Sequence, residues 1–271
     1  MHERISVNSI CLPGASFAQL GEHWRQLGAK RGSFINLQLL EESVDAARAA
    51  LSTGNCRLET IVHPFMPGDP LELREETWEQ PRARLNATLE AAEVLGARSV
   101  YLTTGGHGSG TWEDSARAFA EAVAPCAALA RQKGIDLMIE NAPAVYAELH
   151  IAHTLRDTVT LAEMAGIGVL IDIFSCWTEA GLQDTIRRAH PRLGLVQVSD
   201  YVAGDRALPA RAVPGDGVIP LQRIIGWILD GGYEGAFDLE LLGPRIDEEG
   251  HAAAIARAAE RTGDILRALG A

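Results

Sequence analysis

Four short apolar runs of the chain each carry an oxygen-bearing side chain at or near their end. The runs read LMIEN, VLIDIF, LVQVSD and FDLEL, and the side chains are Glu140, Asp172, Gln197 and Glu240. A carboxylate inside a strand costs several kcal/mol unless it is paired or metal-bound, so three such placements need a common cause. One divalent cation is the simplest cause. The alternative is that each acid makes its own buried salt bridge.

Short β-rich runs alternate with longer segments of helical periodicity, which indicates a parallel sheet built from βα units. The predicted strands, each followed by a helical segment, are 4–10, 32–39, 56–63, 99–105, 136–141, 168–173, 193–199 and 236–242. The clearest helices are expected at 78–95, 112–133 and 247–269. Eight such units in 271 residues predict an α/β fold, a (β/α)8 TIM barrel that forms a single domain over 1–271.

In such a barrel the carboxyl ends of all strands face one rim, so residues far apart in sequence converge there. Alternation along each strand predicts that Glu140, Asp172, Gln197 and Glu240 point inward. Asp238 lies two residues before Glu240 and is expected one layer deeper, as a hydrogen-bonded structural acid and not as a ligand.

Further polar residues are expected at the same mouth. His63 closes the third strand and could bond a substrate oxygen, or it could be a capped loop histidine. His107 lies in TTGGHGSG, a glycine-rich segment suited to close backbone approach or to movement at the surface. Gln38 and Asn141 are further polar contacts of low specificity. The glycine-rich segment is not a P-loop, because it lacks the Lys-Ser/Thr ending.

The segment 200–220 is longer than an ordinary connection and is expected to cover the mouth. Arg206 and Arg211 lie within it, where a guanidinium could hold a substrate carboxylate, a phosphate or an oxyanion. Either arginine could instead pair with a loop aspartate. Trp112 and Trp177 are expected to begin helices at the same rim, either stacking on a sugar face or packing between helix and barrel.

Charge and composition exclude several classes of protein. A formal charge of −12 and a pI near 5.1 argue against a nucleic-acid partner, because such binders usually present a basic face. The start of the sequence lacks a signal-like pattern and no stretch reaches the length of a membrane span, so a cytoplasmic protein without a membrane partner is expected. Four scattered cysteines predict reduced, mostly buried thiols.

These residues and the closing PGDGVIPL…GGYEGAFDLEL resemble the sugar phosphate isomerase/epimerase superfamily of xylose isomerase-like barrels, over nearly the whole chain. The resemblance implies that Glu140, Asp172, Gln197 and Glu240 bind one Mn²⁺, Mg²⁺ or Co²⁺ ion, and that Glu140 and Glu240 also serve as the acid/base pair. Two positions depart from the pattern. Gln197 stands where histidine is usual; some dehydroshikimate dehydratases of this superfamily look similar in using glutamine. Ser175 stands where many members carry a substrate-binding histidine, and it is expected to contact substrate.

Glutamine makes the ligand set all-oxygen, which suits Mg²⁺ or Mn²⁺ over zinc. An ion bound to a ketone and its neighbouring hydroxyl acidifies the intervening C–H and stabilises an enediolate. The predicted function is therefore a metal-dependent isomerase or epimerase acting on a keto-sugar or cyclic polyol. The alternative is a metal-dependent lyase. It would be a dehydratase similar to dehydroshikimate or inosose dehydratases, or it would catalyse elimination on a keto-glycoside.

Two other classes remain open. A zinc-dependent abasic-site endonuclease shares the resemblance, but its metal cluster needs more histidines, and the acidity of the chain opposes DNA binding. A non-catalytic barrel could bind a sugar or act as a subunit of a larger assembly. The presence of all three carboxylates argues against a barrel that has lost its catalytic activity. A homo-oligomer is compatible with the sequence.

Overall fold

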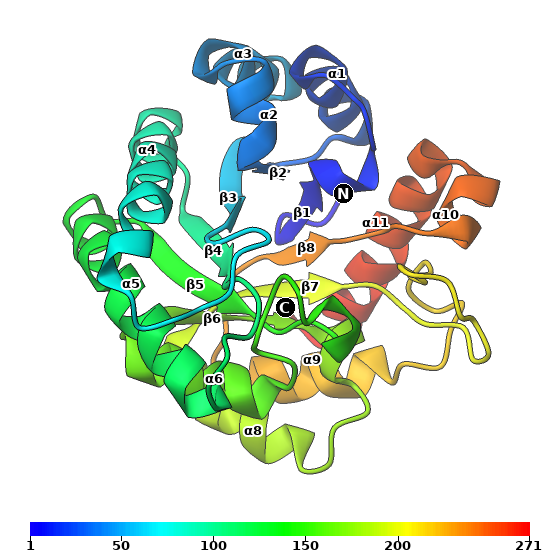
Figure 1. The fold of residues 1–271 in the computed structure, drawn as a ribbon. Coiled ribbons are helices and arrows are strands. Elements are labelled where there is room, and N and C mark those ends of the chain that lie inside the picture. Colours follow the sequence, from blue (N-terminus) through cyan, green and yellow to red (C-terminus); the bar gives the residue numbers. More distant parts are fainter. The chain divides into compact units, whose positions relative to one another are not determined.

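The computed structural model describes residues Met1–Ala271, and its eight parallel strands close a barrel in sequence order, β1 to β8 (Figure 1). The strands are β1 Ile5–Asn8, β2 Arg31–Ile35, β3 Arg57–Pro64, β4 Ser99–Thr103, β5 Asp136–Glu140, β6 Gly168–Asp172, β7 Leu193–Val198 and β8 Phe237–Leu239. The (β/α)8 fold class predicted from the sequence is therefore confirmed.

Helices follow the strands, and several connections carry more than one. The α-helices are α1 Phe17–Leu27, α2 Asn36–Glu41, α3 Val44–Gly54, α4 Glu79–Leu95, α5 Trp112–Gln132, α6 Leu155–Ala165, α7 Ile173–Cys176, α8 Leu182–Ala189, α9 Leu221–Asp230, α10 Pro244–Glu249 and α11 His251–Ala268. The helices predicted at 78–95, 112–133 and 247–269 are confirmed within a few residues. Residues 36–39, predicted as strand, are instead the start of α2.

The chain forms two compact units, one of Met1–Glu59 with Leu195–Ala271 and one of Thr60–Gly194. That residues 1–271 form a single domain stays a prediction. In the first unit α1 and α3 lie side by side (Figure 1), closely enough that a Cβ on Gly21 would lie 2.7 Å from the Ala50 carbonyl oxygen. Phe17 and Phe34 join α1 to β2 through an edge-to-face ring contact of 5.0 Å between centroids.

In the second unit α4, α5 and α6 follow one another around β4, β5 and β6 (Figure 1). A Thr111 capping box begins α5, and Gly134 lies just beyond its end at φ +67°. Phe65 directly follows β3 and packs edge to face against Phe119 of α5, with ring centroids 5.7 Å apart. Both rings are fully buried, so this contact fixes α5 against the end of β3.

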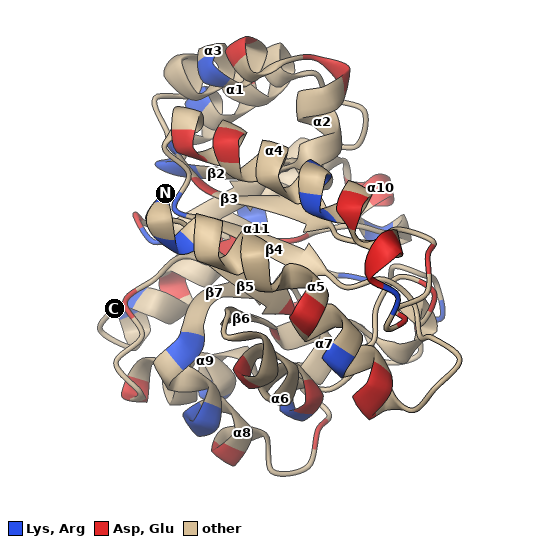
Figure 2. Cartoon of the chain, turned by 60° about the vertical axis from the view of Figure 1, so that its left-hand side comes forward, with Lys and Arg blue, Asp and Glu red and all other residues tan.

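Charged residues lie mostly on helices and on connecting segments (Figure 2). The strands are instead largely apolar, and their few buried acids are therefore exceptional. The four cysteines are free, and Cys11, Cys126 and Cys176 are buried, as predicted. None of the helices combines the length and the apolar character that crossing a membrane requires.

Candidate active site

Glu140 and Asp172 are the last residues of two neighbouring strands in the second unit. Glu140 ends β5 and is 8% exposed, while Asp172 ends β6 and is fully buried. Glu140 is in register with Leu170, and Asp172 follows Leu170 by two residues. Side chains alternate along a strand, so both carboxylates project from the same face of the β5–β6 pair.

Hydrogen bonds from the segment that follows β6 orient the Asp172 carboxylate. Its Oδ1 accepts from the backbone N–H of Phe174 at 3.1 Å, and its Oδ2 accepts from the Ser175 hydroxyl. Asp172 is thus the N-cap of the short helix α7. The sequence predicted that Ser175 contacts substrate; in the structure its hydroxyl proton is directed to Asp172.

Gln197 and Glu240 occupy equivalent places in the first unit. Gln197 is fully buried in β7 and in register with Asp238, and Glu240 follows β8 directly at 8% exposure. Because Glu240 lies two residues beyond Asp238, the Gln197 and Glu240 side chains project from the same face of the β7–β8 pair. Each unit therefore presents a pair of oxygen-bearing side chains at adjacent strand ends.

Arg211 forms a buried ion pair with Glu240. Its Nη2 lies 3.0 Å from Glu240 Oε1, and its Nη1 donates to the Ser199 hydroxyl at 3.0 Å. The backbone N–H of Arg211 donates to the carbonyl of Leu242, which fixes the loop beside the end of β8. Arg211, predicted as a substrate contact, thus compensates the charge of a predicted ligand and base.

Asp238 lies beneath Glu240 on the same face of β8 and is fully buried. Its two oxygens accept from Asn8 Nδ2 and Ser33 Oγ, both at 2.9 Å. Burial raises its pKa to about 6, and these hydrogen bonds oppose the rise. The structure agrees with the prediction that Asp238 is a hydrogen-bonded structural acid.

One carboxylate organises the long segment 200–220. Asp200 accepts backbone N–H groups from Tyr201, Gly215, Gly217 and Ile219 at 2.8 to 3.0 Å. Four hydrogen bonds on one buried acid hold both ends of the segment together. The segment that carries Arg206 and Arg211 is therefore anchored at its base.

The two predicted histidines lie in different environments. His63 is fully buried, and its Nδ1 is hydrogen-bonded to Thr88 Oγ1 of α4 at 2.9 Å. Burial, together with a smaller contribution from the nearby Arg84 charge, lowers the pKa of His63 to about 4. His107 is exposed, and its Nδ1 contacts the carbonyl of Gly108 at 3.1 Å. The structure thus links His63 to helix packing and leaves His107 at the surface.

The glycine-rich segment 103–110 is closely packed, contrary to the expected mobile loop. A Cβ on Gly106 would lie 2.8 Å from the Glu148 carbonyl oxygen, and one on Gly108 would collide with the Leu71 carbonyl oxygen. Gly106 also forms a parallel bridge with Pro70. The glycines are required here because neighbouring backbone approaches closely.

The remaining predicted residues divide between packing and surface. Trp112 begins α5, as expected, and its Nε1 donates to the Ile151 carbonyl at 3.0 Å. Trp177 does not begin a helix; it caps the C-terminal end of α7. Arg206 is exposed and donates to the Asp205 carbonyl at 3.1 Å.

Two side chains that sequence reasoning undervalued contact the ends of β5 and β6. Asn141, fully buried, uses its side-chain amide to bond both the N–H and the C=O of Asp172. His150, also fully buried, is hydrogen-bonded to the carbonyl of Glu140 and to the N–H of Thr104. Asn141 was noted only as a polar contact, and His150 lies in a segment with no recognisable motif.

No group of three or more His, Cys, Asp or Glu side chains in the structure is arranged to hold a metal ion. The four expected ligands divide equally between the two units, so neither unit contains a complete set. Their chemistry nonetheless fits a hard divalent cation, since all four are carboxylate or amide oxygens on buried side chains. We therefore retain these four residues as the candidate ligands.

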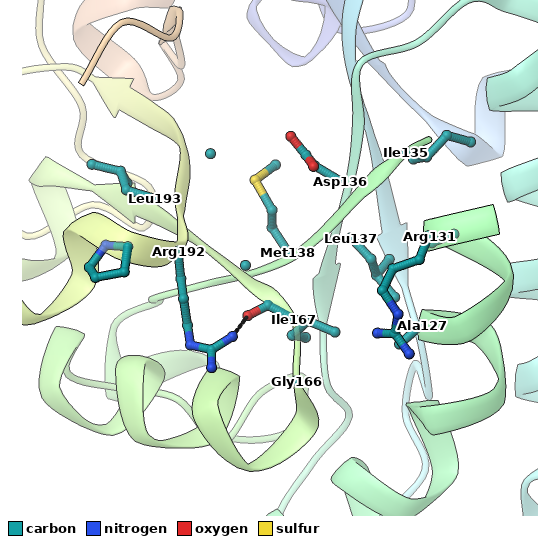
Figure 3. Close-up of a pocket in the computed structure, with 14 residues that line it drawn as sticks. Ala127, Arg131, Ile135, Asp136, Leu137, Met138, Gly166, Ile167, Arg192 and Leu193 are labelled. Carbon is teal, nitrogen blue, oxygen red and sulfur yellow. Dashed lines mark hydrogen bonds between the residues drawn. The ribbon is translucent and has the colours of Figure 1, made fainter. Parts of the chain in front are cut away.

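The second unit contains a cavity of about 310 Å³, and none of the four candidate ligands lines it. Figure 3 shows its lining residues. It is lined by residues at the amino ends of β5 and β6, among them Asp136, Met138 and Gly168. Glu140 and Asp172 end the same strands at the opposite side. The amino-terminal face of such barrels contributes to stability, so this cavity is not the candidate site.

A family model described as the xylose isomerase-like TIM barrel matches residues 16–262. The chain belongs to this family. The family agrees with the closed barrel and with the resemblance noted in the sequence. No functionally curated protein matches the chain in sequence.

Several solved structures share the fold over nearly the full chain. Protein SMc04130 from Sinorhizobium meliloti 1021 has a TM-score of 0.86 and 23% identity, covering 97% of this chain and 98% of its own. The IolI protein with a bound zinc atom has a TM-score of 0.83 and 14% identity, covering 98% of this chain and 99% of its own. D-psicose 3-epimerase with D-tagatose, from Clostridium cellulolyticum H10, has a TM-score of 0.81 and 18% identity, covering 98% of this chain and 99% of its own. At these identities the likeness establishes the fold alone.

Proposed function

We propose that this chain is a divalent-metal-dependent isomerase or epimerase that acts on a keto-sugar or a related cyclic polyol. The proposed ligands are Glu140, Asp172, Gln197 and Glu240, with Glu140 and Glu240 as the acid/base pair. One observation carries the proposal: β5, β6, β7 and β8 each bring a buried oxygen donor to their carboxyl end. In a closed parallel barrel those ends share the rim where catalytic groups usually lie.

The bound ion would supply Lewis-acid polarisation of a substrate carbonyl, and Mg²⁺ or Mn²⁺ suits the all-oxygen donors best. The chain itself supplies the proton transfers. One glutamate removes the proton from the carbon beside the carbonyl, and the other donates a proton to the opposite face or to the neighbouring carbon. Return to the opposite face gives epimerisation, and delivery to the neighbouring carbon gives isomerisation.

Residues around the two glutamates support these roles. Arg211 compensates the buried charge of Glu240 through the 3.0 Å ion pair. Ser175 directs its proton to Asp172 and so orients a ligand. Ser175 is therefore not the second proton donor, which leaves that role to the glutamate pair.

Metal content tests the proposal first. Protein purified without chelator would be analysed by elemental mass spectrometry beside the double variant Glu140→Gln/Glu240→Gln. A control double variant, Glu113→Gln/Glu121→Gln, changes two exposed acids of α5. We expect about one Mn, Mg or Co per chain in the wild type and the control, and none in the folded site variant.

Solvent exchange then tests the chemistry. Keto-sugars incubated with the metal-loaded enzyme in D₂O should gain deuterium at the carbon beside the carbonyl, and Glu140→Gln should abolish the gain. Loss of water or of another leaving group from the substrate would assign the lyase reaction instead. Absence of stoichiometric metal after Mn²⁺ is supplied would refute the proposal and favour a sugar-binding barrel.

A further inference from the structure

The backbone ladders of the second unit stop where its two candidate ligands begin. The β4–β5 register ends at Leu102 and Ile139, and the β5–β6 register ends at Glu140 and Leu170. Asp172 and the carbonyl of Glu140 therefore lie beyond the ladder between these strands. Buried backbone groups at such positions require other partners, because leaving them unbonded costs about 1–3 kcal/mol each.

Asn141 supplies the partners for Asp172. Its Oδ1 accepts from the Asp172 N–H at 2.8 Å, and its Nδ2 donates to the Asp172 C=O at 3.0 Å. One side-chain amide thus bonds both backbone groups of the residue, as a paired strand would. The Asn141 side chain is fully buried, so water does not compete for these bonds.

His150 supplies the partner for Glu140. Its Nδ1 accepts from the backbone N–H of Thr104 at 3.0 Å, and its Nε2 bonds the Glu140 carbonyl at 2.7 Å. A backbone N–H can only donate and a carbonyl can only accept, so the partners assign the ring proton to Nε2. The Thr104 hydroxyl in turn accepts from the N–H of Ile151, which fixes the segment that carries the ring.

We propose that Asn141 and His150 are positioning residues of the candidate metal site, and this inference rests on the proposed function. They join the ends of β4, β5 and β6 through side chains where the backbone ladders have ended. The Glu140 and Asp172 carboxylates are thereby held at defined positions before an ion arrives. Partners that orient metal ligands typically contribute a factor of about 10–100 in metal affinity.

Binding of Mn²⁺ alone to the chelator-treated full-length protein, measured by isothermal titration calorimetry, tests the inference. Asn141→Leu removes both bonds to Asp172, and His150→Gln replaces the two ring nitrogens that bond Thr104 and Glu140 with a flexible amide. Thr158→Ala is the matched control, since Thr158 is fully buried in α6 and its hydroxyl bonds the carbonyl of Thr154, the N-cap of the same helix. Thermal unfolding of each variant measures the accompanying loss of stability.

We expect the Kd for Mn²⁺ to rise about 10–100-fold in Asn141→Leu and by a smaller factor in His150→Gln. Thr158→Ala should lower the Tm but leave the Kd unchanged, which separates positioning from general stability. His150→Gln carries the test if Asn141→Leu does not fold.

The outcomes distinguish this inference from the proposed function. Wild-type protein that binds Mn²⁺, with Glu140→Gln that does not, leaves the proposed function standing. If Asn141→Leu and His150→Gln then bind as tightly as wild type, the positioning role is overturned. Wild-type protein that binds no Mn²⁺ overturns both.

Discussion

Replacing Arg211 with methionine removes its ion pair with Glu240 together with its hydrogen bond to Ser199. Methionine keeps an unbranched stem like that of arginine but removes the guanidinium that lies 3.0 Å from the carboxylate. The side chains of Arg211 and Glu240 are only 7% and 11% exposed, so water replaces little of the lost interaction. Removing one partner of a buried pair typically costs about 3–5 kcal/mol, because the other charge stays buried.

We therefore expect Arg211→Met, without metal, to lose about 3–5 kcal/mol of unfolding free energy and on the order of 10 °C in Tm. The double variant Arg211→Met/Glu240→Gln removes both charges and should recover roughly half of that loss. Saturating Mn²⁺ should reduce the effect of Arg211→Met, because a bound cation compensates the same carboxylate. Urea unfolding of wild type and of both variants measures these differences.

The double-mutant comparison can refute the reasoning. If Arg211→Met costs less than about 1 kcal/mol, the pair behaves like an exposed salt bridge and its burial is irrelevant. If the double variant is as unstable as Arg211→Met, the loss comes from packing and the Ser199 hydrogen bond and not from the buried Glu240 charge.

Three further predictions concern other parts of the chain. Burial lowers the pKa of His63 to about 4 from 6.5, so its stabilisation is complete above pH 6.5 and is lost as the pH falls towards 4. The unfolding free energy, measured with urea, should fall between about pH 7 and pH 4.5 by less in His63→Gln than in the wild type. The two falls should differ by on the order of 3 kcal/mol. Asp200→Asn should cost about 1–3 kcal/mol and speed amide hydrogen exchange across 201–219, since an amide group has one acceptor oxygen in place of two. Gly217→Ala should lower the Tm because its Cβ would collide with Tyr201 and Asp200, whereas Gly226→Ala should raise it through helix propensity, by up to about 1 kcal/mol.

Each of these predictions has a contrary outcome. An unchanged acid sensitivity in His63→Gln would assign that sensitivity to other groups. Exchange as slow as in wild type for Asp200→Asn would mean that the loop is held elsewhere. Equal Tm values for the two alanine variants would mean that neither steric contact nor helix propensity matters at these glycines.

The positions of the strands could be predicted because buried strands appear as short apolar runs separated by turn residues. Helices with strong ends were also predictable, as Gly96 and Gly134 show at the ends of α4 and α5. Residues 36–39 were assigned wrongly because NLQL has the alternation of a strand, and only the tertiary structure lets α2 begin directly after β2.

The candidate ligands could be predicted because acidic residues at the ends of apolar runs are rare, and such runs can be recognised in the sequence itself. The residues that orient them could not. Asn141 and His150 contact backbone groups of Asp172 and Thr104, which lie 31 and 46 residues away in sequence. Backbone partners leave no trace in residue type, so no spacing in the sequence predicts these bonds. The Arg211 pairing was likewise open, because the loop aspartates offered equally good partners.

The anchoring of segment 200–220 at Asp200 makes its outer part a natural insertion point. Residues 206–208 are exposed, and both flanks of the excursion are tied to one carboxylate. Lengthening a loop whose ends are already held costs only about 0.6 kcal/mol for each doubling. A peptide tag or a foreign loop grafted between residues 206 and 208 should therefore leave the barrel intact.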